Sequence, residues 1–251
     1  MKEKEKYAVG TKHMTKEGHE MEIIEKLKNG RRMVRFEDGY EVDTTLTSIS
    51  KGCTYNPYSP SVYNIGYFGV GKYKSSINKN HTIDYKVWGS MFQRCYSNIF
   101  QEKQPAYKGA TVCKEWHNFQ NFAKWYEENC PRIEGEKFQL DKDLLQHDVK
   151  NKIYSPSTCI FLPQKVNIFL ANNQTSNTSG FVGVSWDKSS KKWRAQSCLF
   201  GKNTRIYLGV FSTPEEASEA YKKAREIEAE KVKDYLRSLN YLSENIIQLI
   251  K

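Results

Sequence analysis

Three short runs of strand-forming residues, followed at once by a helix start, constrain the fold of the last third of the chain. The runs cover residues 181–186, 193–199 and 204–211, with turn-forming residues between them. Thr213 fits the N-cap of a helix, Pro214 fits its first turn, and the acidic residues 215–216 suit the positive end of its dipole. The pattern predicts a three-stranded antiparallel sheet covered by one helix.

Alternation along the strands assigns two faces to this sheet, because neighbouring side chains point to opposite sides. The set expected to face the helix comprises Trp193, Ala195, Ser197, Leu199, Ile206, Leu208 and Val210. The set on the opposite face comprises Arg194, Gln196, Cys198, Arg205, Tyr207 and Gly209. The second set is the more polar and cationic of the two.

Charge is segregated between the predicted sheet and its helix. Residues 181–209 hold six lysines and arginines against Asp187 alone, a net charge of +5, within a chain of net charge +10. Residues 214–234 hold five cations against seven carboxylates, a net charge of −2. A basic face attracts polyanions, and arginine and glutamine can pair with base edges in the major groove. The alternative is an ordinary solvated basic face.

The same segment resembles the APETALA-type (ethylene-response-factor) DNA-binding domain over residues 180 to 229. The matching residues are Gly183-Val184, Trp193-Arg194-Ala195, Leu208-Gly209-Val210-Phe211, Thr213 to Ala217, Ala220-Tyr221 and Ala224. The resemblance implies a three-stranded sheet laid in the major groove of double-stranded DNA. It places the reading positions at Ser185, Gln196, Cys198, Arg205 and Tyr207.

The plant members of that family carry arginines where this chain has Ser185 and Cys198, so their usual target sequence is not carried over. Arg194, on the same face, is a candidate to compensate. The residues expected to bind DNA are therefore Ser185, Lys188, Lys192, Arg194, Gln196, Arg205 and Tyr207.

The first stretch of the chain reads as short strands joined by tight turns. Strand-like runs cover 21–26, 32–36 and 41–46, and the dipeptides Asn29-Gly30 and Asp38-Gly39 are typical of hairpin turns. This spacing predicts a small five-stranded, Src-homology-like β-barrel over residues 1–52. Bracing or unspecified docking is the role we expect for it.

The middle of the chain turns helical after an irregular connector over 53–84. Apolar residues at spacings of three and four predict two buried stripes: Trp88, Met91, Phe92 and Cys95, then Trp116, Phe119, Phe122 and Trp125. A polar stretch from Asn172 to Ser179 predicts a linker. The expected class is therefore multidomain α+β, with an HNH-like domain over 85–171, a linker over 172–179 and the DNA-binding domain with a helical tail over 180–251.

Residues 85 to 173 resemble a phage and mobile-element family related to HNH nucleases. The matching residues are Trp88, Met91, Arg94-Cys95, Pro105, Tyr107, Val112-Cys113, Trp116, Phe119, Leu140 to Asp143, Tyr154 to Pro156, Cys159 and Asn167. The resemblance implies a degenerate ββα-metal domain that holds one divalent metal, magnesium or manganese, and cleaves phosphodiesters. It makes Asp141 and Asn167 the metal ligands.

The base position of that site is taken by Lys142. A lysine of ordinary pKa, ~10.4, is protonated at neutral pH and cannot act as a base unless its pKa is strongly depressed. His147 is a substitute if the loop turns back, so the catalytic candidates are Asp141, Lys142 and His147. The alternative is that the aspartates at 141 and 143 cap a turn.

The spacing of the cysteines and the hydropathy of the chain bear on disulfides, zinc sites and membrane spans. The six cysteines are scattered without a Cys-x-x-Cys pair, which indicates reduced thiols; a structural zinc site on Cys95, Cys113, Cys159 and His117 is not expected. No apolar run approaches the length of a membrane span, and we expect no membrane partner. The expected location is the cytoplasm of a bacterial host of a phage or prophage.

Together these patterns predict a phage or homing-type HNH-like endonuclease that binds double-stranded DNA at chosen sequences. Two alternatives stay open: a catalytically inactive DNA-binding regulator, and a phage accessory protein that inhibits a host nucleic-acid-processing protein. We also expect a fragment from Thr175 to Lys251 to fold alone. Its core would comprise Val184, Trp193, Leu208, Phe211, Tyr221 and Ile227.

Overall fold

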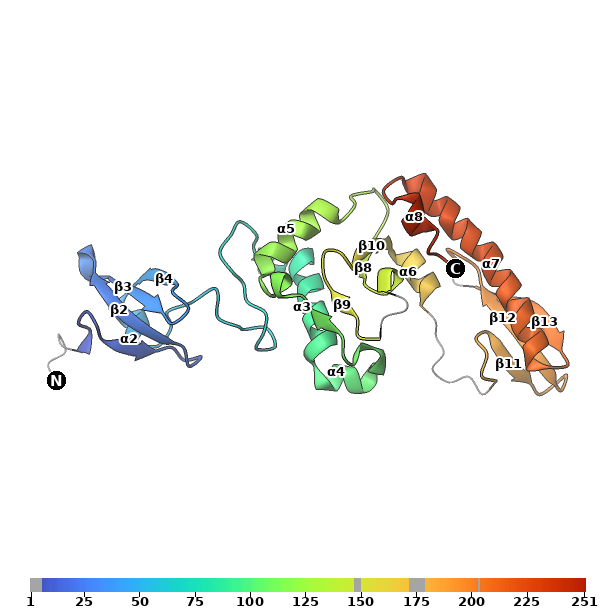
Figure 1. Ribbon diagram of the computed structural model, residues 1–251, viewed down its shortest axis with the longest axis horizontal. Helices are drawn as coiled ribbons and strands as arrows, with labels where there is room; N and C mark the ends of the chain where they lie inside the picture. The colour runs from blue at the N-terminus through green and yellow to red at the C-terminus, as the bar shows by residue number, and fades with distance from the viewer. Residues whose placement is uncertain (1–5, 147–149, 172–178, 203) are drawn as a thin grey trace. The chain divides into compact units, whose positions relative to one another are not determined.

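The computed structural model describes residues 6–146, 150–171, 179–202 and 204–251 (Figure 1). The chain is of mixed α and β content, as predicted, and divides into two compact units, Met1–Tyr126 and Glu127–Lys251. Among the described residues, no helix is long and apolar enough to cross a membrane. The six cysteines are present as thiols.

The N-terminal part of the first unit is an antiparallel sheet of four strands. The strands are β1 (Lys12–Met14), β2 (Glu20–Lys26), β3 (Arg32–Phe36) and β4 (Glu41–Thr44), in the order β1-β2-β3-β4. A short helix, α2 (Leu46–Ser50), follows. The core between this sheet and α2 includes Met21, Ile23, Val34, Phe36 and Ile49. Asn29 and Gly30 take positive φ angles, as the predicted turn requires.

The closed five-stranded barrel predicted for residues 1–52 is not found in the described part of the chain, where the sheet is open. The third predicted strand, 41–46, stops at Thr44 because Thr45 becomes a helix N-cap. Its hydroxyl accepts a hydrogen bond from the Ser48 amide at 3.1 Å, which starts α2 where a further strand would have run.

The rest of the first unit is built on helices with an aromatic core. Its elements are β5 (Ser76–Ile77), β6 (Asn80–His81), α3 (Ile83–Tyr96), α4 (Asn98–Lys103), β7 (Thr111–Val112) and most of α5 (Phe119–Asn129), whose last turn crosses the boundary at Tyr126. The predicted stripes are buried at Trp88, Met91, Phe92, Cys95, Trp116, Phe119 and Phe122. The indole of Trp88 donates a hydrogen bond to the Trp116 carbonyl at 2.7 Å, which joins the two stripes.

The second unit begins with β8 (Phe138–Asp141), β9 (Ile153–Tyr154), β10 (Ile160–Pro163) and α6 (Gln164–Leu170). Strands β8 and β10 pair antiparallel, with Asp141 opposite Ile160. The C-terminal module follows: β11 (Val184–Asp187), β12 (Lys192–Cys198), β13 (Arg205–Phe211), α7 (Pro214–Leu239) and α8 (Glu244–Ile247). The three strands form the predicted antiparallel sheet, and the first half of α7 covers one of its faces (Figure 1).

Helix α7 starts where the sequence predicts. The Thr213 hydroxyl accepts a hydrogen bond from the Glu216 amide at 3.2 Å, and the Glu216 carboxylate accepts one from the Ser212 amide at 3.1 Å. The first bond satisfies an amide that a helix N-terminus leaves without a partner, and the second ties the residue before the N-cap to the first turn. The helix ends at Leu239, and the capping residue Asn240 takes a left-handed conformation.

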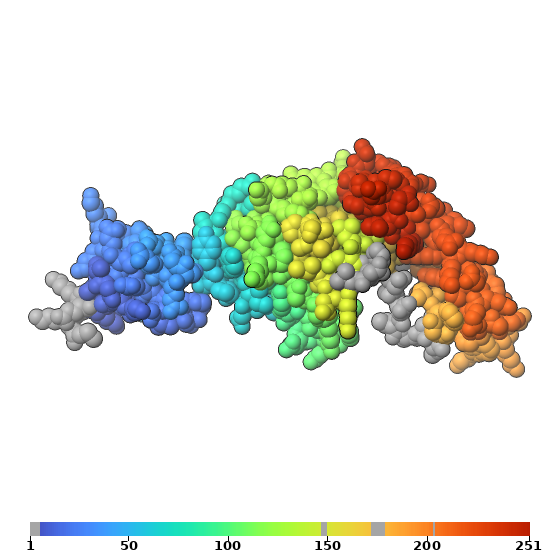
Figure 2. All heavy atoms as spheres, in the orientation of Figure 1, coloured from blue at the N-terminus to red at the C-terminus, as the bar shows by residue number. Residues whose placement is uncertain are grey.

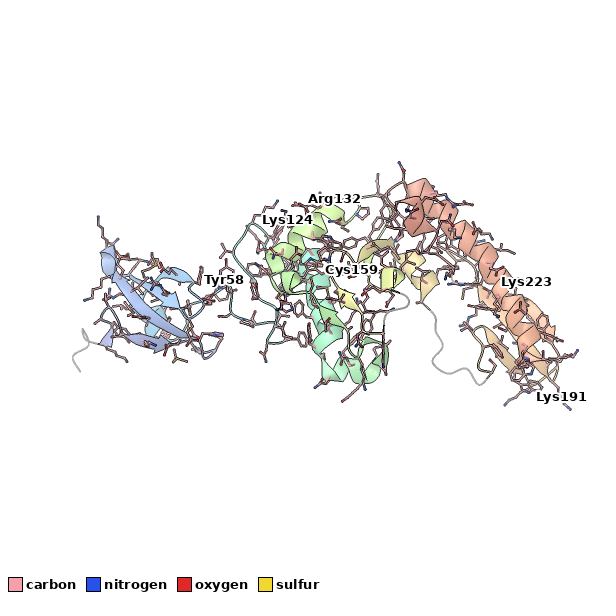
Figure 3. The ribbon with its side chains drawn as sticks, in the orientation of Figure 1. Tyr58, Lys124, Arg132, Cys159, Lys191 and Lys223 are labelled. Carbon is pink, nitrogen blue, oxygen red and sulfur yellow. The ribbon has the colours of Figure 1, made fainter. Side chains whose placement is uncertain are left out.

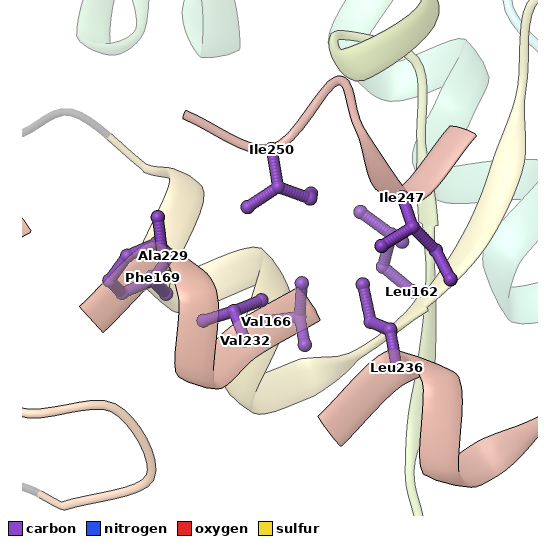
Figure 4. Close-up of a cluster of buried hydrophobic side chains, with 8 residues drawn as sticks. All are labelled: Leu162, Val166, Phe169, Ala229, Val232, Leu236, Ile247 and Ile250. Carbon is purple, nitrogen blue, oxygen red and sulfur yellow. The ribbon is translucent and has the colours of Figure 1, made fainter. Parts of the chain in front are cut away.

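A second core joins the later part of α7 to residues that precede the predicted linker. It comprises Leu162, Val166, Phe169, Ala229, Val232, Leu236, Ile247 and Ile250 (Figure 4). The same elements lie together in the space-filling view, with α7 and α8 in orange and red beside β10 and α6 in yellow (Figure 2). Arg225 reinforces this contact, because its guanidinium lies over the Phe169 ring and donates to the Phe169 carbonyl.

This second core changes the predicted division of the C-terminal half. The buried side chains of α7 do not all serve the sheet: Ala229, Val232 and Leu236 lie at helical spacing and face α6 and α8. Ile227, which we expected in the core, is 62% exposed. A fragment from Thr175 would lack α6 and leave part of its apolar surface uncovered. Residues 172–178 of the predicted linker lie outside the described residues, and the predicted domain boundaries stay predictions.

Candidate nucleic-acid interface

Cross-strand pairing defines the outer face of the β11-β12-β13 sheet, the face away from α7. Side chains of directly paired residues lie on the same face of a sheet. Arg194 pairs with Ser185 and Val210, Gln196 pairs with Tyr207, and Cys198 pairs with Arg205. The opposite row is buried against α7, where Val184, Ala195 and Ala217 meet.

The outer face therefore gathers five of the seven residues predicted to bind DNA: Ser185, Arg194, Gln196, Arg205 and Tyr207. Tyr207 is 61% exposed, and Arg205 and Ser185 are also exposed. The remaining two, Lys188 and Lys192, lie exposed at the turn between β11 and β12, beside Lys191 (Figure 3). Whether these residues contact DNA stays a prediction.

Simple alternation fails in β13 because the strand contains a bulge. Ala195 pairs with Gly209, but the next residue, Gln196, pairs with Tyr207, so Leu208 is the extra residue. Gly209 has a φ angle of +128°, which residues with a side chain rarely adopt. Glycine at this position therefore permits the bulge.

The bulge corrects two of the predicted face assignments. We expected Gly209 on the outer face and Val210 toward the helix. In the structure Gly209 shares the helix-facing row of Ala195, whereas Val210 shares the outer row of Arg194. The extra residue reverses the alternation, so an apolar side chain flanks Arg194 on the outer face.

Arg194 is held by an acidic neighbour. Its Nη2 lies 2.9 Å from Oδ2 of Asp187, and only 12% of the Asp187 side chain is exposed. Asp187 also accepts hydrogen bonds from the Ser189 amide at 3.1 Å, the Ser189 hydroxyl at 2.8 Å and the Ser190 hydroxyl at 3.1 Å. The bond from Arg194, followed by those from Ser189, lowers the pKa of Asp187 far below its ordinary value. From the sequence, Asp187 counted only as an opposing charge, although an aspartate two residues before a serine in a turn is a capping signal.

Close packing behind the sheet depends on Gly183, which has a φ angle of +73°. A β-carbon at this position would collide with the ring of Tyr221 and lie 2.7 Å from the Gln196 carbonyl. Gly183 also accepts a hydrogen bond from the Gln196 amide at 2.9 Å. The glycine therefore lets α7 approach the strand that carries Gln196.

The residues predicted to form a nuclease site have other partners. Asp141 is buried at the end of β8, and its Oδ1 accepts hydrogen bonds from the amides of Asp143 at 3.0 Å and Leu144 at 2.8 Å. Burial raises the pKa of Asp141 above its ordinary value. This is the turn-capping role that we kept as the alternative.

Lys142 and Asn167 also make contacts within the protein. The Lys142 side chain is 5% exposed, and its ammonium lies 2.7 Å from the Asp143 carboxylate, which Lys152 reaches at 2.6 Å. The Asn167 amide donates to Gln139 Oε1 at 2.9 Å, so the hydrogen bond runs from α6 to β8 but not to Asp141. His147, the proposed substitute base, lies outside the described residues.

Metal-ligating side chains do not cluster in the described part of the chain. No group of three or more histidine, cysteine, aspartate or glutamate residues there is placed to hold a metal ion. The thiols of Cys95 and Cys159 are buried, and burial raises the pKa of Cys113. A raised thiol pKa disfavours the thiolate form that binds zinc.

Comparison with known proteins agrees with the geometry of the C-terminal module. Residues 179–227 match the AP2 domain family. This match supports sequence-specific binding of double-stranded DNA by the three-stranded sheet and its helix. Neither the curated proteins nor the solved structures gave a significant match. The AP2 match does not extend to residues 85–171, where the HNH-like assignment stays a prediction.

Proposed function

We propose that this protein binds double-stranded DNA at chosen sequences by placing the outer face of the β11-β12-β13 sheet in the major groove. The observation that carries the proposal is the register that gathers Arg194, Gln196 and Arg205 on one face. Arginine and glutamine are the side chains that pair with guanine and adenine edges. The exposed lysines at the β11–β12 turn supply phosphate contacts.

Arg205→Ala in the full chain tests this surface. Loss of a phosphate contact should lower the slope of log affinity against log salt by about 1, and loss of a base contact should cost about 1–3 kcal/mol and relax specificity. The matched control is Lys223→Ala, which removes one exposed cation from α7, outside the outer face of the sheet (Figure 3). Equal binding by wild type and Arg205→Ala in gel retardation across a salt series would exclude this role for Arg205.

We propose metal-dependent cleavage of the bound DNA, in the manner of an HNH-like endonuclease, as a second function. The observation that favours it is the order of β8, β10 and α6, a pair of antiparallel strands followed by a helix, with Asp141 at the end of β8 and Asn167 on α6. The fit to a divalent metal is poor, because the Asp141 carboxylate is engaged by backbone amides and Asn167 by Gln139. We therefore derive no catalytic step through a metal.

The assay that distinguishes cleavage from binding alone is incubation of the protein with supercoiled plasmid and magnesium or manganese. Nicking by wild type that is lost in Asp141→Ala, with DNA affinity kept, supports the enzyme. Retardation without nicking supports an inactive DNA-binding regulator. A third possibility is an accessory protein that inhibits a host nucleic-acid-processing protein in the bacterial cytoplasm. A partner retained in a pull-down from nuclease-treated lysate would support it.

A further inference from the structure

The ion pair between Arg194 and Asp187 fixes a guanidinium on the outer face of the sheet. Asp187 is itself held by Ser189 and Ser190, so the carboxylate is a fixed anchor for the arginine. Only one of five guanidinium N–H groups is needed for the 2.9 Å contact with Asp187. The terminal amino groups of the guanidinium keep further donors, because 38% of the Arg194 side chain is exposed, although Nε is buried.

The neighbours of Arg194 leave room for a partner to approach. In its cross-strand row, Arg194 lies between Ser185 and Val210, and Ser185 is exposed. Neither side chain is charged, so the only carboxylate that we find for Arg194 among the described residues is Asp187. Arg194 Nε is buried and has no hydrogen-bond partner among the described residues. The donors of this side chain are therefore incompletely satisfied by the protein.

We propose that Arg194, positioned by Asp187, recognises a guanine in the bound DNA, and that Asp187 thereby determines specificity at one base pair. The inference rests on the proposed function. Two parallel N–H groups of a guanidinium match the O6 and N7 acceptors of guanine. The other bases do not offer that pair of acceptors in the major groove, so a fixed fork selects guanine.

The ion pair argues for base recognition over a phosphate contact. A neighbouring carboxylate cancels much of the charge that would attract a phosphate, so Asp187 weakens Arg194 as a phosphate ligand. The same carboxylate restricts the rotation of a long side chain, which favours a contact that depends on direction. The lysines at 188, 191 and 192 are exposed and suit the phosphates better.

The test measures base preference with the full chain. A binding site is selected from a randomised duplex library with wild-type protein, and each base pair of that site is then replaced in turn. Affinities are measured for wild type, Asp187→Asn and Arg194→Lys. Wild type should lose about 5- to 160-fold in affinity when one particular G·C pair is replaced. We call this loss of affinity the penalty at that base pair. In both variants the penalty at this G·C pair should fall to no more than about 3-fold, and the penalties at the other base pairs should stay unchanged.

Two controls separate positioning from charge and folding. Asp234→Asn makes the same change of charge on α7, where Asp234 pairs with Arg237 at 2.8 Å, and should keep the guanine preference. Ser189→Ala removes one hydroxyl bond to Asp187 but keeps the ion pair, and should also keep it. Circular dichroism establishes that each variant is folded.

The outcomes distinguish the inference from the proposed function. If wild type prefers certain base pairs and folded Asp187→Asn keeps every penalty, the positioning role of Asp187 is refuted and DNA binding stands. If Arg194→Lys also keeps every penalty of the wild type, base recognition by Arg194 is refuted and DNA binding again stands. If wild type binds all duplexes equally, the proposed sequence-directed function is itself wrong.

Discussion

Leu236 provides the sharpest test of how the C-terminal half of the chain is held together. Its side chain is fully buried on α7, in a core with Val166 of α6 and Ile247 of α8. Truncation of such a side chain to alanine loses its transfer free energy and leaves a cavity, at a cost of about 2–5 kcal/mol. Native domains are stable by only about 5–15 kcal/mol, so Leu236→Ala removes a large share of the stability of this core.

The lost stability should appear in two helices. Hydrogen exchange of the full chain should speed up in α6 as well as in α7, because both helices lose contacts in the same core. The matched control is Ile227→Ala on the same helix: Ile227 is 62% exposed, and its truncation should change the stability by no more than about 0.5 kcal/mol. Exchange rates by mass spectrometry at 25 °C report each helix separately.

One result would refute the reasoning. If Leu236→Ala speeds exchange in α7 but leaves residues 164–170 at the wild-type rate, α6 does not share a core with α7. Residues 180–251 would then be the separable module that the sequence predicted.

Two further predictions concern the packing around the sheet. Gly183→Ala should lower the midpoint of thermal unfolding, because the added β-carbon would collide with Tyr221 and the φ of +73° at this position strains any residue with a side chain. The control is Gly201→Ala, which has a φ of +69° with open space around it and therefore measures the backbone strain alone. Burial raises the pKa of Glu228, but hydrogen bonds from Lys231 at 2.6 Å and the Phe200 amide at 2.7 Å outweigh it and leave the pKa below 4.5. A carboxylate with a lowered pKa stabilises the fold above its unfolded pKa, so this contribution should fade from about pH 5 downward in wild type and be missing from Glu228→Gln. A urea denaturation series over pH would contradict this if both proteins showed the same acid dependence.

Local signals in the sequence located the elements of the C-terminal module. The start of α7 was predictable because a threonine, a proline and two glutamates act within one turn, and the structure shows the Thr213 cap that they indicate. Strand faces followed from alternation as far as Tyr207. At Gly209 and Val210 the prediction was wrong, because the bulge at Leu208 depends on pairing with β12 and not on β13 alone.

Features that depend on distant partners were not predictable. Ala229, Val232 and Leu236 read as part of a helical tail, since nothing within residues 214–251 indicates that α6 covers them. The candidate site shows the same limit: Arg194 was identified as a cation on the outer face, but its anchor on Asp187 needs the hairpin geometry that brings residues 187 and 194 together. At the N-terminus, the capping bond of Thr45 ended a strand that propensity alone would continue.

Helix α7 belongs to two cores, and this has a consequence for both proposed functions. Its first half packs on the sheet through Ala217, and its second half packs on α6 and β10 through Leu236. The helix has neither glycine nor proline between residues 215 and 239, so it has no built-in kink. The sheet is thereby oriented by packing with respect to β10, which pairs with β8 and so with the strand that carries Asp141. Cleavage at Asp141 would then fall at a fixed distance from the bound sequence, whereas a flexible tether would spread the cuts over many positions.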